Sequence, residues 1–238
     1  MPSPSLEARR VLVVGSNGGI GAATVAALVE EGARVCSADR DIGLDVTKPE
    51  GANVIVERAL DELGGLDGVV HAVGMSGRDL GDGPPSRCSD EAWAAVMNVN
   101  LASALRLVRA TWPHLREGSS LVFVGSVLAR TTDPNFLTAA YAASKGGLIS
   151  LVRATAREGA PRGIRANLVS PGLVDTPMAS RALRTDQQLA ERLPQLQPLG
   201  GCALAPEEVA DGITWLLSSR SAAATGIDLV LDRGWSLR

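Results

Sequence analysis

The sequence predicts a single α/β domain built on parallel strands, and three observations support this. Short apolar runs, such as those over 11–14 and 121–125, are typical of strands buried on both faces of a parallel sheet. Helical patterns separate these runs, so that strands and helices alternate along the chain. The 238 residues suffice for one domain of ordinary size, and the sequence contains neither an internal repeat nor a linker. We therefore expect residues 1–238 to form one domain.

Composition and charge argue against several functional classes. The apolar share of 45% and the charged share of 21% are normal for a soluble globular protein. A net charge of −3 argues against a nucleic-acid-binding or polybasic membrane surface. No apolar run approaches the roughly 20 residues that span a bilayer, and residues 1–7 do not resemble a signal peptide. Three cysteines without metal spacing and two histidines predict reduced thiols, no metal site and a cytoplasmic protein.

A glycine-rich turn follows the first strand, 10–14. It reads Gly15-Ser16-Asn17-Gly18-Gly19-Ile20-Gly21 and leads into a helical pattern that stops at Gly32. Such glycines let a phosphate approach backbone N–H groups at the start of a helix, although an unliganded turn has the same spacing. A second strand, 33–38, ends at Asp39, where a dinucleotide fold places the carboxylate that binds the adenosine ribose. The turn, the strand and the carboxylate together predict a dinucleotide site.

Tyr141 and Lys145 are the second candidate site. Tyr141 is the only tyrosine of the chain, and Lys145 is one of two lysines. The stretch 139–152 has a helical pattern, so residues four apart share a face. A lysine ammonium beside a phenol favours the phenolate and turns a weak acid into a base, although a structural pair would show the same spacing. Ser126 ends the strand 121–125, fifteen residues before Tyr141.

These motifs resemble the short-chain dehydrogenase/reductase family over nearly the whole chain, from Val11 to Gly234. The resemblance implies a doubly wound, Rossmann-like parallel sheet with its active site at the carboxyl ends of the strands. It also implies hydride transfer between a nicotinamide cofactor and a secondary alcohol or ketone. Tyr141 would exchange the hydroxyl proton, Ser126 would bind the reacting oxygen, and Lys145 would lower the pKa of Tyr141 and hold the ribose. The implied catalytic residues are Asn100, which supports a proton path, Ser126, Tyr141 and Lys145.

The resemblance also assigns a cofactor site. Asp39 would repel the extra phosphate of NADP, so we expect NAD to be preferred, with Arg40 as a partial offset. Asp45 matches an aspartate that approaches the adenine, although it also fits a helix cap before Pro49. The implied contacts are Gly15, Ser16, Asn17, Gly19, Ile20, Gly21, Asp39, Arg40, Asp45, Val46, Ala72, Gly74, Tyr141, Lys145, Pro171, Gly172, Val174 and Thr176.

Three departures from the family pattern predict local differences. The short connection from Asp39 to Asp45 leaves room for a turn and a stub of strand in place of a helix. His71 stands where the family has asparagine, and we expect it to be packed and hydrogen-bonded rather than catalytic. Arg233 replaces a glycine and predicts a different turn. The segment 177–201 alternates apolar and charged residues and predicts a mobile helical flap over the substrate.

Two other functions fit the same motifs. One is an NADPH-dependent carbonyl or 3-oxoacyl reductase of the same fold, and the other is a dinucleotide-binding sensor or scaffold without turnover. The expected partner is a small alcohol or ketone, with no nucleic acid and no membrane. The resemblance further predicts a homotetramer or homodimer. No cluster of residues in the sequence identifies the substrate.

Overall fold

The computed structural model describes residues 6–134, 136–179 and 187–237, and within them the chain forms one parallel sheet. The strand order is β2-β1-β3-β4-β5-β6, and every neighbouring pair is parallel. The strands are β1 (Arg10–Val14), β2 (Arg34–Ala38), β3 (Gly68–His71), β4 (Ser120–Val124), β5 (Arg165–Pro171) and β6 (Asp228–Leu231). The order reverses beside β1, which confirms the predicted doubly wound sheet.

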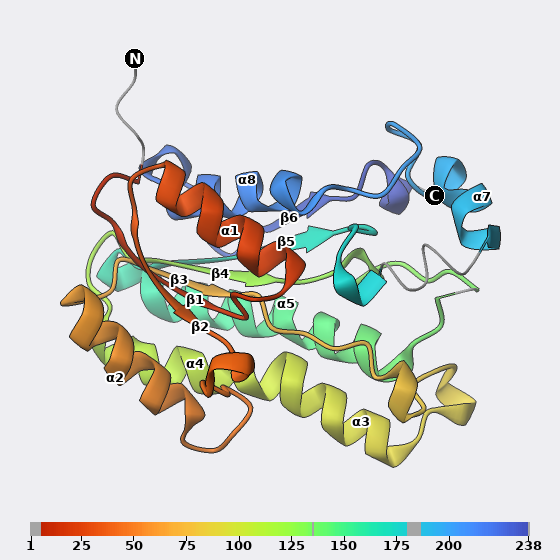
Figure 1. The fold of residues 1–238 in the computed structure, drawn as a ribbon, viewed down its shortest axis with the longest axis horizontal. Coiled ribbons are helices and arrows are strands. Elements are labelled where there is room, and N and C mark those ends of the chain that lie inside the picture. The colour runs from red at the N-terminus through yellow and green to blue at the C-terminus, as the bar shows by residue number, and fades with distance from the viewer. Residues whose placement is uncertain (1–5, 135, 180–186, 238) are drawn as a thin grey trace.

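Helices cover both faces of this sheet (Figure 1). Val11 and Val13 of β1 face the layer of α1 (Gly19–Glu30) and α8 (Pro206–Leu217). Leu12 and Val14 face the opposite layer, because successive side chains of a strand point to opposite faces. That layer contains α2 (Gly51–Leu63), α3 (Asp90–Met97), α4 (Ser103–Thr111) and α5 (Ala139–Gly159), and α7 (Gln187–Leu196) lies beyond the carboxyl ends of the strands. None of the described helices is long and apolar enough to cross a membrane.

The connection after β2 is as short as the sequence predicts. A single 3₁₀ turn, Arg40–Ile42, replaces a crossover helix. Asp45 accepts hydrogen bonds from the backbone N–H and the hydroxyl of Thr47, at 2.9 and 2.6 Å, and these residues form a turn without the expected stub of strand. α2 begins at Gly51, later than the expected Pro49, so Asp45 does not cap it.

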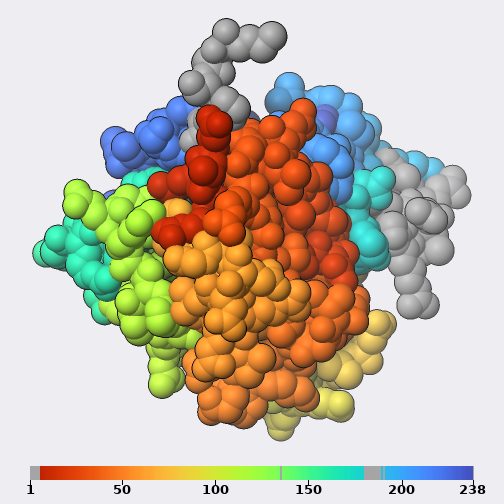
Figure 2. Space-filling view, turned by 60° about the vertical axis from the view of Figure 1, so that its left-hand side comes forward, coloured from red at the N-terminus to blue at the C-terminus, as the bar shows by residue number. Residues whose placement is uncertain are grey.

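The N-terminal segments, coloured red to orange, form the centre of the molecular face that Figure 2 shows.

The chain from Ser89 to Leu115 is mostly helical, but the helix is interrupted. The Ser89 hydroxyl caps α3 by accepting from the backbone N–H of Ala92 at 3.0 Å. Between α3 and α4 the chain widens into one π-helical turn over Asn98–Ala102, and such turns are frequent at functional sites. A 3₁₀ turn that contains Pro113 ends the helix, as a proline in its last turn predicts.

The turn after β6 contains Arg233 where the family has a glycine, and its contacts differ from those that a glycine could make, as expected. Arg233 adopts a left-handed conformation with φ of 51°, and its guanidinium contacts both carboxylate oxygens of Glu208 at 2.8 Å. This ion pair joins the C-terminal turn to the start of α8, and a second glycine could not form it. The Asp232 carboxylate accepts from the backbone N–H groups of Gly234 and Ser236 at 2.9 and 2.7 Å.

Candidate active site

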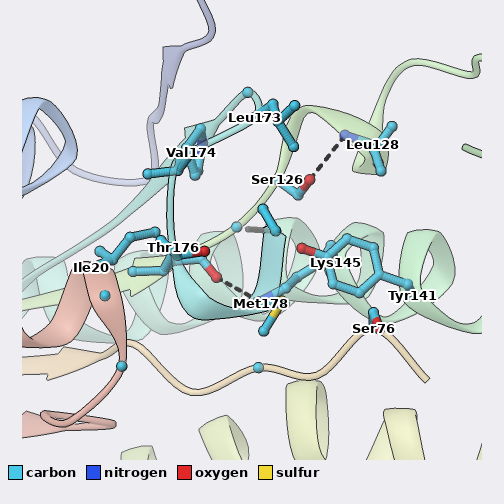
Figure 3. A pocket seen from close by; sticks show the side chains of 18 of the residues that line it. Ile20, Ser76, Ser126, Leu128, Tyr141, Lys145, Leu173, Val174, Thr176 and Met178 are labelled. Atoms are coloured by element: carbon cyan, nitrogen blue, oxygen red, sulfur yellow. Dashed lines mark hydrogen bonds between the residues drawn. The ribbon is translucent and has the colours of Figure 1, made fainter. Parts of the chain in front are cut away.

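The carboxyl ends of the strands and the start of α1 surround a cavity of about 310 Å³ (Figure 3). The sequence-predicted residues in its wall are Gly19, Ile20, Gly21, Ala72, Gly74, Ser126, Tyr141, Lys145, Pro171, Gly172, Val174 and Thr176. The other predicted residues lie outside this wall: Gly15, Ser16, Asn17, Asp39, Arg40, Asp45, Val46 and Asn100. The structure therefore brings three of the four predicted catalytic residues into one cavity with part of the predicted cofactor contacts.

Tyr141, Lys145 and Ser126 meet where β4 ends against α5. Tyr141 and Lys145 lie one turn apart on α5, and the Lys145 ammonium is 5.8 Å from the centre of the Tyr141 ring. The ammonium is buried and donates a hydrogen bond of 2.9 Å to the carbonyl oxygen of Val124. Ser126 follows β4, and its hydroxyl accepts from the backbone N–H of Leu128 at 3.2 Å. Sheet and helix thus fix the three side chains against the same cavity.

Burial dominates the electrostatics of the Tyr141–Lys145 pair. It raises the pKa of the Tyr141 phenol, and a hydrogen bond with Ser126 and the charge of Arg78 act in the opposite direction. Burial also lowers the pKa of the Lys145 ammonium to about 8. In the protein alone the pKa of Tyr141 is therefore raised and not lowered, because the desolvation of the phenolate outweighs the hydrogen bond with Ser126 and the charge of Arg78. At neutral pH the phenol and the ammonium both carry their protons.

Asn100 lies in the π-helical turn and is fully buried. Its side-chain oxygen accepts from the backbone N–H of Met75 at 2.8 Å, and its amide donates to the Met75 carbonyl at 3.1 Å. The same amide donates to the hydroxyl of Ser144 at 2.9 Å. Asn100 therefore ties the segment after β3 to the helix that carries Tyr141, and its part in a proton path stays a prediction.

The glycine turn fits a phosphate-bearing cofactor. Gly15 has φ of 86°, and a side chain on it would meet the backbone of Ala72 at 2.8 Å. A side chain on Gly21 would overlap the carbonyl oxygen of Gly15. The hydroxyl of Ser16 is buried without a hydrogen-bond partner in the described part of the chain. A tight turn with an unpaired hydroxyl at the start of a helix provides the donors that a pyrophosphate needs.

Asp39 lies at the end of β2, beside this turn. One carboxylate oxygen accepts from the backbone N–H of Asn17 at 3.0 Å, and the other accepts from that of Asp41 at 3.3 Å. These bonds fix the carboxylate and leave further acceptor positions for the hydroxyls of a ribose. The exposed Arg40 guanidinium is 3.7 Å from Asp41 and is not held at the site. The geometry therefore fits a dinucleotide.

His71 is a buried structural residue in place of the usual asparagine. Its Nε2 lies 2.8 Å from the hydroxyl of Ser103, which donates to the carbonyl of Val99 in the π-helical turn. Burial, together with the charge of Lys145, lowers the pKa of His71 to about 3. A ring that is neutral at physiological pH and bonded away from the cavity is unsuited to proton transfer, in agreement with the expectation of a packed histidine.

Asp82 is a functional candidate that the sequence did not suggest, because it lies in a polar, glycine-rich loop. Its buried carboxylate accepts from the backbone N–H groups of Ala140 and Tyr141, at 3.0 and 2.9 Å. It therefore caps α5 from 58 positions away, since Thr138, just before the helix, provides no side-chain cap. The missing local cap is the signal that could have prompted a search for a distant one.

We expect Asp82→Ala to destabilise the protein and impair turnover together. Loss of a helix cap costs about 1–2 kcal/mol of unfolding free energy, and Tyr141 itself loses a backbone partner. Denaturant unfolding should show the first effect, and a lower kcat with an unchanged KM for the cofactor should show the second. Asp79→Ala, an exposed change in the same loop, is the control. Unchanged stability and kcat in Asp82→Ala would rule out this role.

The predicted flap is anchored at its C-terminal end. Gln197 is fully buried, and its amide donates to the carbonyls of Leu173 and Cys202 at 3.3 and 2.8 Å. Arg192 of α7 pairs with the buried Asp133, from the loop after β4, at 3.0 Å. The helical part of the prediction is confirmed over α7. Residues 180–186 lie outside the described residues, and the mobility of the flap stays a prediction.

Fold and site together define a dinucleotide-dependent oxidoreductase. A family model described as enoyl-(acyl carrier protein) reductase matches residues 40–236. A 3-oxoacyl-(acyl-carrier-protein) reductase of Vibrio cholerae is 33% identical over 250 residues, which cover 97% of this chain and 98% of the relative. A short-chain dehydrogenase/reductase of Pyricularia oryzae is 32% identical over 190 residues, which cover 71% of this chain and 70% of the relative. The chain belongs to the short-chain dehydrogenase/reductase family.

A solved structure agrees with this assignment. Aldohexose dehydrogenase of Thermoplasma acidophilum superimposes with a TM-score of 0.86 at 26% identity, over 99% of this chain and 96% of that chain. The likeness covers both layers of helices and the sheet between them. The family binds a nicotinamide dinucleotide, which agrees with the glycine turn and Asp39.

Proposed function

We propose that this protein reduces a ketone to a secondary alcohol, or catalyses the reverse reaction. The observation that carries the proposal is the meeting of Ser126, Tyr141 and Lys145 in one cavity beside the glycine turn. A bound nicotinamide dinucleotide supplies or accepts the hydride. The raised pKa of Tyr141 keeps the phenol protonated at neutral pH, which suits a proton donor in ketone reduction.

The chain's own residues have separate roles in this proposal. The Ser126 hydroxyl binds the carbonyl oxygen, and Tyr141 gives that oxygen a proton. Lys145 keeps a positive charge near the phenol below a pH of about 8 and holds the nicotinamide ribose. Gly19 and Thr176 lie in contact, since a side chain on Gly19 would be 2.7 Å from Thr176, and together they would border the nicotinamide.

Among substrates, we favour 3-oxoacyl compounds, because relatives at 31–33% identity are named 3-oxoacyl-(acyl-carrier-protein) reductases. This alternative from the sequence is now supported better than a simple alcohol dehydrogenase. Acetoacetyl-coenzyme A, a neutral 3-oxo ester and a panel of secondary alcohols, each assayed with both nicotinamide cofactors, test it. Turnover of alcohols alone would contradict the 3-oxoacyl assignment, and binding of cofactor without any turnover would favour a sensor.

We propose NAD as the cofactor, although the alternative function named above, a 3-oxoacyl reductase, is NADPH-dependent. The fixed Asp39 carboxylate would face the 2′-phosphate of NADP, and a repulsion between unit charges at 4 Å is on the order of 4 kcal/mol. We expect kcat/KM to favour the NAD form by roughly tenfold or more, which needs about 1.4 kcal/mol. Asp39→Ser should lower the ratio of kcat/KM with the NAD form to kcat/KM with the NADP form, whereas Asp41→Ser should leave this ratio unchanged. Equal or better kcat/KM with the NADP form would overturn the preference.

The predicted assembly and compartment also remain proposals. An apolar hollow crosses α3, α4 and α5, with Leu105 exposed beside it, and would suit contact with a second copy of the chain. Its lining residues are Met97, Asn98, Leu101, Ala102, Leu105, Gly147 and Leu151. We propose a homotetramer or homodimer that acts on a small molecule in the cytoplasm.

A further inference from the structure

Arg78 is a charged side chain in the cavity wall to which the proposed chemistry gives no role. It lines the same cavity as Ser126 and Tyr141. Its guanidinium carbon lies 5.6 Å from the centre of the Phe136 ring, and Phe136 packs edge-on against Trp235 at 5.3 Å. A guanidinium stacked on an aromatic face keeps its N–H donors free at its edge. The side chain is therefore oriented by an aromatic wall while its donors remain available.

The loop that carries Arg78 packs against α3 and is hydrogen-bonded to α5. Gly77 and Gly81 flank it with φ of 72° and 92°, and the Gly81 N–H donates to the Arg78 carbonyl at 3.1 Å. A side chain on Gly77 would overlap Val96 of α3. The next residue in this loop, Asp82, is the distant cap of α5. The turn that carries Arg78 is thus held in a fixed position relative to Tyr141.

The charge of Arg78 is not neutralised within the described structure. The described lining residues include two cations, Arg78 and Lys145, and no carboxylate. No described carboxylate, including the adjacent Asp79, forms an ion pair with Arg78. The other cation, Lys145, donates to the Val124 carbonyl and is assigned to the nicotinamide ribose in the proposed function. An anion that enters the cavity would therefore find its partner in Arg78.

Arg78 also lies close to the reacting centre. Burial raises the pKa of Tyr141, and the charge of Arg78 is one of the two influences that oppose it. Arg78 and Tyr141 line the same cavity, so an anion that Arg78 binds shares that cavity with the carbonyl that Tyr141 protonates. In a small oxo acid the carboxylate and the ketone are only a few bonds apart, so a cavity of about 310 Å³ can hold both groups.

We propose that Arg78 binds a carboxylate of the substrate, so that the preferred substrates are small oxo acids and the corresponding hydroxy acids. The planar guanidinium can bind such a carboxylate through two parallel hydrogen bonds. Leu128 and Leu173 in the same wall leave apolar contact for a short aliphatic chain. The inference rests on the proposed ketone reduction, but not on the choice of a 3-oxoacyl thioester. It assigns instead a ketone that carries its own free carboxylate, and the experiment below distinguishes the two substrates.

Acetoacetate and methyl acetoacetate test the proposal, because they share the ketone and differ in the negative charge. We expect the wild type to reduce acetoacetate with the higher kcat/KM. Arg78→Gln should lower the ratio of kcat/KM for acetoacetate to kcat/KM for the ester by about tenfold or more, mainly through the KM for acetoacetate. The kcat/KM of Arg78→Lys for acetoacetate should lie between the values of the wild type and of Arg78→Gln, since lysine keeps the charge and loses the paired donors. Arg87→Gln, an exposed change farther along the same loop, is the matched control.

Several outcomes would overturn the proposal. An equal loss for acid and ester, with a shifted pH profile, would show that Arg78 acts on Tyr141 and not on a carboxylate. A larger loss with acetoacetyl-coenzyme A than with the methyl ester would assign the anion to a distant phosphate. Reduction of the ester with refusal of acetoacetate would leave the proposed function intact and reject the role of Arg78. Failure of the wild type to reduce any of the three would reject both.

Discussion

Replacing Tyr141 by phenylalanine is expected to lower kcat by about 10²–10⁴-fold, the range that a positioned general acid or base contributes. The change removes one hydroxyl and leaves the ring in the cavity wall. Folding and cofactor binding should persist, because no described hydrogen bond of the fold depends on that hydroxyl apart from its contact with Ser126. Steady-state kinetics with a 3-oxo substrate measure the loss, and fluorescence titration with cofactor measures binding.

The ionisation of Tyr141 can be followed directly, because it is the only phenol of the chain. In the protein alone, burial raises the pKa of the phenol, so phenolate absorbance should appear above the ordinary midpoint of about 10. With NAD bound, the positive nicotinamide ring adds a favourable charge, and we expect the midpoint to fall below 10. The difference between the two titrations isolates the contribution of the cofactor, and Tyr141→Phe provides the baseline.

Lys145→Met is the companion change. The ammonium has a pKa lowered to about 8 by burial, so its positive charge is present below that pH and is lost above it. The charge of Lys145 can therefore lower the midpoint of Tyr141 only where the phenol titrates below about pH 8. If bound NAD brings the midpoint into that range, Lys145→Met should raise it. Normal turnover in Tyr141→Phe, or a Tyr141 midpoint near 10 in the NAD complex, would show that the proton is exchanged elsewhere.

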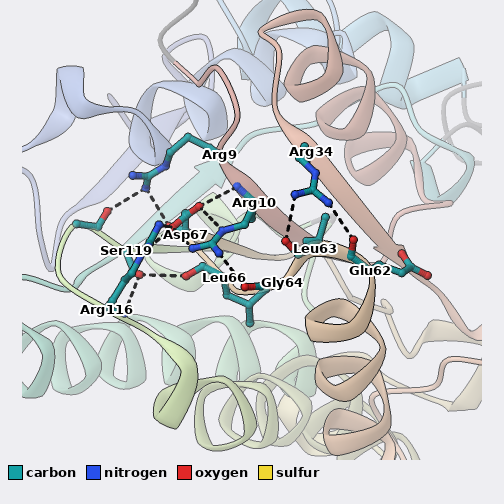
Figure 4. Close-up of polar contacts among 11 residues, drawn as sticks. Arg9, Arg10, Arg34, Glu62, Leu63, Gly64, Leu66, Asp67, Arg116 and Ser119 are labelled. Carbon is teal, nitrogen blue, oxygen red and sulfur yellow. Dashed lines mark hydrogen bonds and ion pairs between the residues drawn. The ribbon is translucent and has the colours of Figure 1, made fainter.

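The second large effect concerns stability and lies at the opposite, amino end of the strands (Figure 4). Asp67 precedes β3 and is almost fully buried. Its two carboxylate oxygens accept from the Arg10 side chain at 2.9 Å each, and one of them also accepts from Arg116 at 2.6 Å. The network therefore joins the starts of β1 and β3 to the chain before β4, far from the cavity.

Asp67→Ala should cost about 3–5 kcal/mol of unfolding free energy, because it leaves Arg10 partly buried without its carboxylate. Denaturant unfolding measures the loss, and kcat at low temperature should change little, since the site lies at the other end of the sheet. Arg58→Ala breaks the exposed Arg58–Glu62 pair and is the control, with an expected cost of about 0.5 kcal/mol. Similar losses of unfolding free energy in Asp67→Ala and Arg58→Ala would show that burial of the Asp67 ion pairs does not increase their contribution to stability.

The pH dependence of stability has a defined sign at Asp67. Burial by itself would raise the pKa of this carboxyl, but the hydrogen bonds from Arg10 and Arg116 outweigh it and hold the pKa well below its usual range. The folded state thus binds this proton more weakly than the unfolded state does. The contribution is fully present above the unfolded pKa of about 4 and is lost as the pH falls further. Asp67→Asn should flatten the acid side of the stability curve.

Local chemistry made much of the fold and part of the site predictable. The structure has the apolar run of β1 and the glycine turn as expected, because both depend on neighbours in the chain. Asp39 is also at the expected strand end, where it accepts a hydrogen bond from the backbone of Asn17 in that turn. The spacing of Tyr141 and Lys145 places both on one face of a helix by geometry alone. The helix starts at Gly51 rather than Pro49, because the tight turn around Asp45 and Thr47 occupies the preceding residues.

The sequence by itself determined the alternation of strands and helices, the glycine-rich turn and the Tyr141–Lys145 pair, since each depends on periodicity or on spacing within one element. The doubly wound order of the sheet and the role of Ser126 were implied by the family resemblance. The tertiary structure decided which distant groups act on the Tyr141–Lys145 pair. Asp82 reaches the start of α5 from another loop, and Arg78 enters the cavity from the same loop. It also decided the raised pKa of Tyr141, because desolvation depends on what packs around a side chain, and no local pattern reveals this.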